Sequence, residues 1–143
     1  KPITGIVVET QMQKTSLQRK SVQDLSGASH AVCVHVMPGI CGFTAVIKAR
    51  KMENKKLRFQ ISNSECEQIK RLAATLQEMD WKDLFVPLTR NPVYVNAEKS
   101  GCHPSCVMPA AMLKAAEAAM GMAIPKDVNF RFQPCDGGPT HEN

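Results

Sequence analysis

The strongest constraint on the fold is an alternation of side chains over residues 31–37, in which valine occupies every second position. A repeat of two residues is typical of a strand that turns one face to a core. Pro38-Gly39 then imposes a turn, and further strand patterns follow at residues 43–49 and 57–61. Because strands joined by short turns pair antiparallel, the pattern predicts an antiparallel sheet.

Two helices are predicted to follow these strands. Ser64 is a good N-cap for the first helix, Glu67 would complete a capping box, and apolar side chains recur at helical spacing as far as Met79. The second helix is expected to open near Ser105 or Met108, where Pro109 suits a first turn. Small residues dominate this second helix, which would let it pack closely on the sheet.

Three other segments also have strand patterns, at residues 3–9, 93–95 and 127–132. The predicted fold class is therefore α+β, with an antiparallel sheet of three to five strands and two helices packed on one face.

A chain of 143 residues is expected to form one domain with a hydrophobic core. Residues 31–133 would be this single α+β domain, which carries the cysteine site described below. Residues 1–30 would supply an N-terminal strand and a polar, basic arm, and residues 134–143 a C-terminal tail.

The sequence predicts a cytoplasmic protein with no membrane segment. It contains no run of about 18 apolar residues, and its first ten residues do not form an export signal. The chain begins with Lys1 rather than Met, so the removal of a targeting segment stays an open question. Six cysteines without an export signal fit a reducing compartment better than a disulfide framework.

The net charge of +5 is concentrated at residues 48–58 and, more thinly, in the N-terminal arm. Such basic groups can attract an acidic protein or a phosphate-bearing ligand, or they can simply keep a hairpin turn in solvent. Aromatic side chains are not interleaved with them, so the pattern does not favour nucleic-acid binding.

Four of the six cysteines stand where thiolates are chemically useful. Cys41 lies in a glycine-flanked loop, Cys66 at a predicted helix start, and Cys102 and Cys106 just before the second helix. Helix N-termini present free N–H groups and a partial positive charge, which stabilise a thiolate or an anionic cluster. Four convergent thiolates would form a complete ligand set for zinc or an iron–sulfur cluster.

The spacing of these cysteines leaves three interpretations open. Cys102 and Cys106 are separated by three residues, whereas zinc ribbons and common ferredoxins use a gap of two. The four thiols could share a metal or cluster, Cys102 and Cys106 could form a redox-active pair, or the cysteines could be inert core residues. His103 could add a zinc ligand or form a local hydrogen bond, and Cys135 in the tail is left out of the site.

No recognised catalytic motif is present in the sequence. A P-loop, Gly-x-Gly-x-x-Gly, His-Glu-x-x-His and Gly-x-Ser-x-Gly are all missing. We therefore assign no catalytic residue, and a non-enzymatic role is favoured although the sequence does not decide the point.

The order of several short motifs resembles that of a known family. These motifs are PGICGF from residue 38, SEC from residue 64, NPVY from residue 91, CHPSCVMP from residue 102 and IPKDV from residue 124. Over residues 32–132 they resemble a family of small uncharacterised cysteine-containing proteins found largely in strictly anaerobic archaea and bacteria. The resemblance implies that the four cysteines belong together and that an oxygen-sensitive cluster suits the setting, but it supplies no activity.

The sequence and this resemblance together predict a metal-binding protein. Cys41, Cys66, Cys102 and Cys106 are expected to bind an iron–sulfur cluster, a four-iron form ahead of zinc, in a small accessory or electron-transfer subunit of a larger redox assembly. One alternative is a non-enzymatic interaction subunit whose cysteines are structural, with zinc or no metal, and which docks on a protein partner through its basic arm and hairpin. A second alternative is a thiol–disulfide redox protein.

Overall fold

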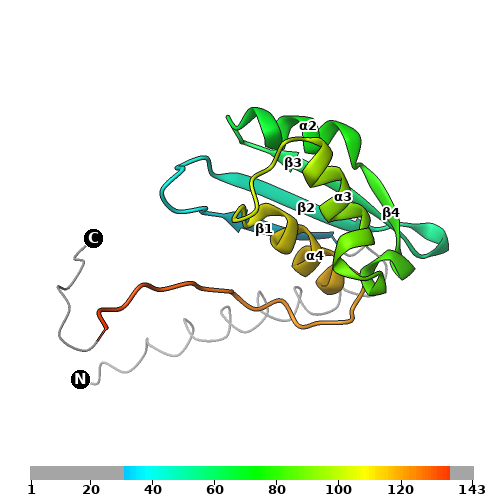
Figure 1. The fold of residues 1–143 in the computed structure, drawn as a ribbon. Helices are drawn as coiled ribbons and strands as arrows, with labels where there is room; N and C mark the ends of the chain where they lie inside the picture. Colours follow the sequence, from blue (N-terminus) through cyan, green and yellow to red (C-terminus); the bar gives the residue numbers. More distant parts are fainter. Residues whose placement is uncertain (1–30, 136–143) are drawn as a thin grey trace, which may run out of the picture.

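The structure is a computed structural model that describes residues 31–135, and four antiparallel strands form its framework. They are β1 (Ala31–Val36), β2 (Ala45–Lys51), β3 (Lys56–Ser62) and β4 (Glu78–Asp80), and each pairs with the next along the chain (Figure 1). The α+β class and the antiparallel sheet are therefore as predicted, and four strands fall within the expected range.

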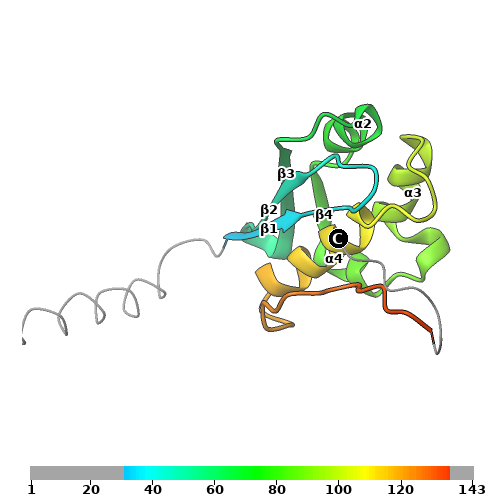
Figure 2. The ribbon, with the colours of Figure 1, turned by 90° about the vertical axis from the view of Figure 1, so that its left-hand side faces the viewer.

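Three α-helices accompany the sheet, where two were predicted. They are α2 (Glu67–Thr75), α3 (Pro92–Lys99) and α4 (Met108–Ala119). Short 3-10 turns occur at η2 (Glu53–Lys55), η3 (Trp81–Phe85) and η4 (Leu88–Arg90). Helix α4 packs on β1 and β2, α2 contacts β3, and α3 lies between α2 and α4 (Figure 2). The packing of all helices on a single face stays a prediction.

The core follows from the alternation in the strands. Along β2, Ala45, Ile47 and Ala49 are buried, while the residues between them are partly exposed. Leu72 of α2 and Met112 of α4 are fully buried among these strand residues. Burial of such aliphatic and thioether side chains supplies most of the favourable free energy of folding.

The predicted strand at residues 93–95 is wrong, because this segment lies inside α3. The Asn91 side chain accepts a hydrogen bond from the Val93 N–H at 3.0 Å, and Pro92 occupies the first helical position. An Asn N-cap followed by Pro is a strong helix start. The β-branched residues Val93 and Val95 gave the competing strand signal, but Val93 is fully buried within the helix.

The first predicted helix is shorter than expected at both ends. Cys66 rather than Ser64 is the N-cap, and the Ser64 hydroxyl accepts a hydrogen bond from the Cys66 N–H at 3.3 Å instead of forming the predicted capping box. The helix ends at Thr75, and Met79 lies in β4 opposite Leu57 of β3. Met79 is still buried, so the apolar pattern identified the core but not the helix end.

Of the other two predicted strands, one is wrong and one lies outside the described residues. Residues 127–132 form no strand in the described chain, and their apolar side chains are exposed. The reason is that no neighbouring strand accepts their backbone hydrogen bonds there. The predicted strand at residues 3–9 lies outside the described residues, as does the N-terminal arm.

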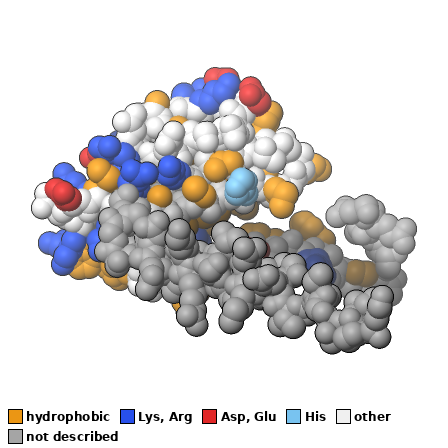
Figure 3. All heavy atoms as spheres, turned by 180° about the vertical axis from the view of Figure 1, so that it is seen from behind, with side chains coloured by type: hydrophobic (Ala, Val, Ile, Leu, Met, Phe, Trp, Pro, Cys, Tyr) orange, Lys and Arg blue, Asp and Glu red, His pale blue; other side chains and the backbone are white. Residues whose placement is uncertain are grey.

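The sheet face opposite the core is basic. Lys48, Arg50 and Arg58 line a shallow hollow on it, and Lys and Arg side chains gather on this side of the molecule in Figure 3. The Arg58 guanidinium donates a hydrogen bond to Glu78, and this ion pair lowers the pKa of the Glu78 carboxyl. Within residues 31–135, no helix has the length and apolar character needed to cross a membrane.

Candidate metal centre

Three segments that are distant in sequence lie at the same end of the molecule. They are the loop of residues 37–44 between β1 and β2, the start of α2, and the connection of residues 100–107 between α3 and α4 (Figures 1 and 2). Each segment contains at least one of the four cysteines predicted to form a site. The fold therefore gathers the segments as the metal-site prediction requires.

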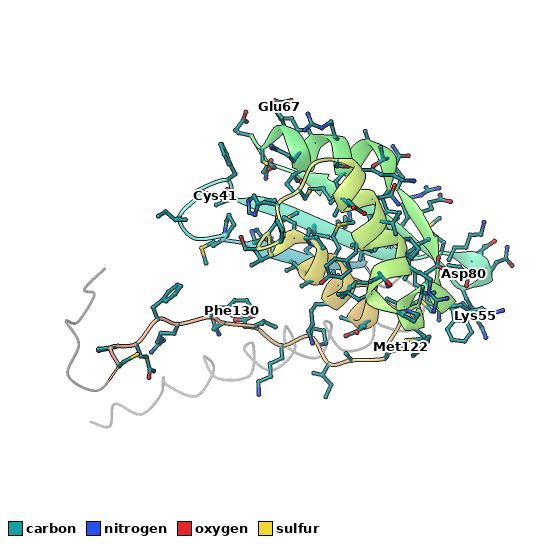
Figure 4. All side chains as sticks on the ribbon, viewed as in Figure 1. Cys41, Lys55, Glu67, Asp80, Met122 and Phe130 are labelled. Carbon is teal, nitrogen blue, oxygen red and sulfur yellow. The ribbon has the colours of Figure 1, made fainter. Side chains whose placement is uncertain are left out.

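Cys41 stands at the tip of its loop and is exposed (Figure 4). Gly39 and Gly42 flank it with φ angles of 83° and 71°, a left-handed conformation that favours glycine. The Gly42 N–H donates a hydrogen bond to the Gly39 carbonyl at 3.0 Å, which closes a tight turn around Cys41. No other part of the described chain lies within 4 Å of a Cβ added at either glycine, so the loop stands clear of the domain.

Cys66 is the N-cap of α2 and is partly buried. Its thiol donates a hydrogen bond to the Gln68 side-chain oxygen at 3.1 Å. The position next to the first helical N–H groups places the thiol where a negative charge is stabilised. The prediction that Cys66 lies at a helix start is confirmed.

Cys102 and Cys106 are partly buried against the edge of the core. The Cys102 N–H donates to the Ala97 carbonyl, and the Cys106 N–H donates to the His103 carbonyl, each at 3.0 Å. His103 is hydrogen-bonded through Nδ1 to the Ser105 hydroxyl at 3.2 Å, which is the local role predicted as the alternative to zinc binding. The backbone of Cys102 is therefore tied to α3, and that of Cys106 is tied to the connection itself.

The four thiols are close enough to influence one another electrostatically. Burial raises the pKa of the Cys102 thiol, and negative charge on Cys106 and Cys66 raises it further. Burial likewise raises the pKa of the Cys106 thiol, with further contributions from Cys66 and Cys41. In both cases burial is the main cause of the shift, and the neighbouring thiols are smaller causes.

Two groups act in the opposite direction and favour thiolates. The Arg71 guanidinium lowers the pKa of Cys102, and the backbone N–H of Met108, the first residue of α4, lowers that of Cys106. Burial outweighs both effects, so the pKa of each of the two thiols lies above its ordinary value. A bound cation would offset the free-energy cost of ionising these buried thiols, because positive charge stabilises neighbouring thiolates.

Arg71 and Ser100 are site residues that sequence reasoning missed. Arg71 Nε donates a hydrogen bond to the Ser100 carbonyl at 3.1 Å, which ties the connection of residues 100–107 to α2. Gly101 follows Ser100 with a φ of 79°, a left-handed conformation that favours glycine, and it lies beside Arg71. The left-handed Gly101 beside Cys102 was a local signal of a tight turn, but nothing in the sequence pointed to Arg71.

The Ser100 hydroxyl is a second unusual feature near Cys102. The residue is 3% exposed, and its hydroxyl has no hydrogen-bond partner among residues 31–135. A buried hydroxyl without a partner costs free energy. The Ser100 hydroxyl can therefore still donate a hydrogen bond.

The thiols gather without forming a finished ligand cage. Over residues 31–135, no three His, Cys, Asp or Glu side chains are arranged so that they could hold a metal ion directly. The two remaining cysteines are exposed and belong to other segments: Cys33 lies in β1 opposite Lys48, and Cys135 follows the C-terminal extended segment.

Comparison with known proteins identifies the family but no function. No curated protein and no solved structure matches the chain significantly. The model of a family of unknown function (DUF6951) matches residues 32–132, a range that includes all four cysteines of the site. This agrees with the predicted resemblance to an uncharacterised family. The chain belongs to this family.

Proposed function

We propose that this member of the DUF6951 family binds an iron–sulfur cluster through Cys41, Cys66, Cys102 and Cys106. The observation that carries the proposal is that the three segments containing these four cysteines lie at one end of the domain (Figures 1 and 2). A four-iron cluster with four thiolate ligands is preferred to zinc.

The surroundings of the thiols support an anionic cluster. A cluster with four thiolates carries net negative charge, and the Arg71 guanidinium and the Met108 N–H both favour negative charge at Cys102 and Cys106. The buried Ser100 hydroxyl, two residues before Cys102, has a hydrogen bond to donate. Hydrogen bonds to cluster or thiolate sulfur tune the reduction potential.

The proposed role is that of a small accessory or electron-transfer subunit in a larger redox assembly. A bound four-iron cluster would supply one-electron transfer, and the exposed Cys41 loop would place it near the molecular surface. Met37 and Ile40 in this loop are 84% and 108% exposed, an apolar rim on which a protein partner could dock. We place the protein in the cytoplasm of an anaerobe, where an oxygen-sensitive cluster persists.

The test is the iron, zinc and acid-labile sulfide content of protein purified without oxygen, with its visible spectrum. We expect iron with matching sulfide and broad charge-transfer absorption in the unaltered chain, and loss of the cluster in Cys102→Ala. Cys33→Ala is the matched control, because Cys33 is an exposed thiol on β1 outside the site. The Cys33→Ala protein should retain the full iron and sulfide content.

Other outcomes identify the alternatives. Full metal content in Cys102→Ala overturns the assignment of this ligand. Zinc without sulfide makes the site structural, and no metal in a stably folded protein leaves an interaction subunit. A thiol–disulfide protein would show one unusually acidic thiol on alkylation at different pH, whereas burial raises the pKa of both Cys102 and Cys106.

A further inference from the structure

The segment that follows α4 exposes large apolar side chains to water. From residue 124 to 135 the chain has no regular secondary structure, and Ile124, Phe130 and Phe132 are 89%, 82% and 96% exposed. Figures 1 and 4 show the segment apart from the sheet, with Phe130 on its extended part. Exposed apolar groups in such a row are typical of a surface that is covered by a partner.

The segment has the pattern of a strand with one apolar face. Val128, Phe130 and Phe132 occupy alternate positions, with Asn129 and Arg131 between them. In an extended chain the three apolar side chains would project to one side and the two polar ones to the other. Residues 127–132 also equal the six-residue length of β1.

Strand β1 offers an edge that is suited to receive such a strand. β1 pairs with β2, and no strand among residues 31–135 pairs with its other side. Its sequence, Ala-Val-Cys-Val-His-Val, contains no proline, lysine, arginine or acidic residue. Proteins usually protect an edge strand with such residues because an open edge pairs with other chains.

The core is also incomplete at this edge. Val32 and Val34 of β1 are only partly buried, whereas their partners Ala49 and Ile47 on β2 are fully buried. A neighbouring strand with large apolar side chains on the core side would cover the two valines. The alternate residues Val128, Phe130 and Phe132 provide such side chains.

We propose that residues 127–132 of one copy pair with the open edge of β1 in a second copy, so that two chains exchange C-terminal strands. The segment lies apart from its own sheet in both ribbon views (Figures 1 and 2), which favours another copy as the acceptor. Each chain carries both a donor segment and an acceptor edge. A two-fold exchange therefore satisfies both copies and leaves neither edge open.

Both elements belong to the family domain, since the match to residues 32–132 contains all of the donor segment and nearly all of β1. The proposal does not depend on the cysteine site. A dimer joined by disulfides would imitate it, because Cys33, Cys41 and Cys135 are exposed. The test is therefore made in the presence of a thiol reductant.

The experiment compares the full chain with Phe130→Asp and Asn129→Asp. These neighbouring substitutions each add one negative charge, but Phe130 lies on the apolar face of the segment and Asn129 on the polar face. Molar mass from light scattering and amide hydrogen exchange of β1 are measured on each. Only the β1 amides that face away from β2 report on the edge, because the others already bond to β2. We expect a dimer in which these outward amides are protected for the unaltered chain and Asn129→Asp, and a monomer in which they exchange at least tenfold faster for Phe130→Asp.

Each other outcome overturns the proposal. A monomer with unprotected β1 amides in the unaltered chain shows that the edge is open. A monomer with protected amides shows that another part of the same chain covers it. If Phe130→Asp leaves the dimer intact, the dimer forms through another surface. Circular dichroism confirms folding, and Phe132→Asp repeats the test if Phe130→Asp does not fold.

Discussion

The two ends of the sheet differ in whether their polar groups have hydrogen-bond partners within the domain. At the end with the β2–β3 hairpin, polar groups pair with one another: Asp80 and Asp83 form a capping box, and Arg58 binds Glu78. At the cysteine end, two partly buried thiols have raised pKa values, and the Ser100 hydroxyl has no partner among the described residues. The polar groups named at the first end have hydrogen-bond partners within the domain. At the cysteine end the Ser100 hydroxyl can still form a hydrogen bond.

The sharpest test of this difference is the pH dependence of zinc binding to the reduced, metal-free protein. Burial raises the pKa values of Cys102 and Cys106 above their ordinary value, so both thiols must lose their protons when a metal binds near neutral pH. Affinity should therefore rise with pH by about tenfold per pH unit for each proton released, and by at least about a hundredfold per unit from these two thiols. Competition with a chromophoric chelator measures it.

The rise should continue from neutral pH until the thiols ionise, which occurs above their ordinary pKa of 9.0. Arg58→Ala at the opposite end serves as the control and should leave the pH dependence unchanged. A zinc affinity that does not vary with pH would contradict the assignment of Cys102 and Cys106 as ligands.

The second prediction concerns the end with the β2–β3 hairpin. Asn91 is buried, caps α3 and donates hydrogen bonds to the carbonyls of Asp83 and Val86 at 2.9 and 3.4 Å. Asn91→Ala leaves these groups unpaired and should lower the free energy of unfolding by about 1–3 kcal/mol. Urea denaturation measures the loss, and metal content should not change.

Asn96→Ala is the matched control for Asn91→Ala. Asn96 lies in the same helix and donates one hydrogen bond, to the Pro92 carbonyl at 2.8 Å, from a partly exposed position. Asn96→Ala should lower the free energy of unfolding by less than Asn91→Ala does. Equal losses would show that the network around Asn91 adds nothing to the stability of this end.

The smallest expected effect is at Ser100. In the metal-free protein, Ser100→Ala removes a buried hydroxyl without a partner and should raise the free energy of unfolding by about 1 kcal/mol. In the loaded protein the same substitution should lower the reduction potential, because it removes a donor near the thiolates. A loss of stability without metal would show that the hydroxyl is already paired.

The sequence predicted three of the four strands and the start of α4, but it placed β4 inside the first helix and predicted strands at residues 93–95 and 127–132 that did not form. The period-two pattern of β1, β2 and β3 depends only on which face is buried, and the strands formed within two residues of the predicted bounds. The helix bounds depend on competing local signals. At Val93 the N-cap and proline outweighed β-branching, and after Thr75 the pairing of Met79 with Leu57 ended the helical pattern.

The candidate site was predictable in its residue types but not in its environment. Cysteines at helix starts and beside glycines identified Cys41, Cys66, Cys102 and Cys106. The burial that raises the pKa of two of them comes from packing against the core, and the Arg71 contact joins residues 29 positions apart. Such contacts depend on the folded chain and have no local sequence signal.

The hydrogen bond from Arg71 to the Ser100 carbonyl has a kinetic consequence. It fastens the segment of Cys102 and Cys106 to the helix that Cys66 caps, while Cys41 stands on a separate exposed turn. If the four cysteines bind a metal as proposed, Cys66, Cys102 and Cys106 would bind it first and Cys41 would complete its coordination. Cys41 would then set the rate of release, and a Cys41→Ser chain should lose its metal faster without losing the ability to take it up.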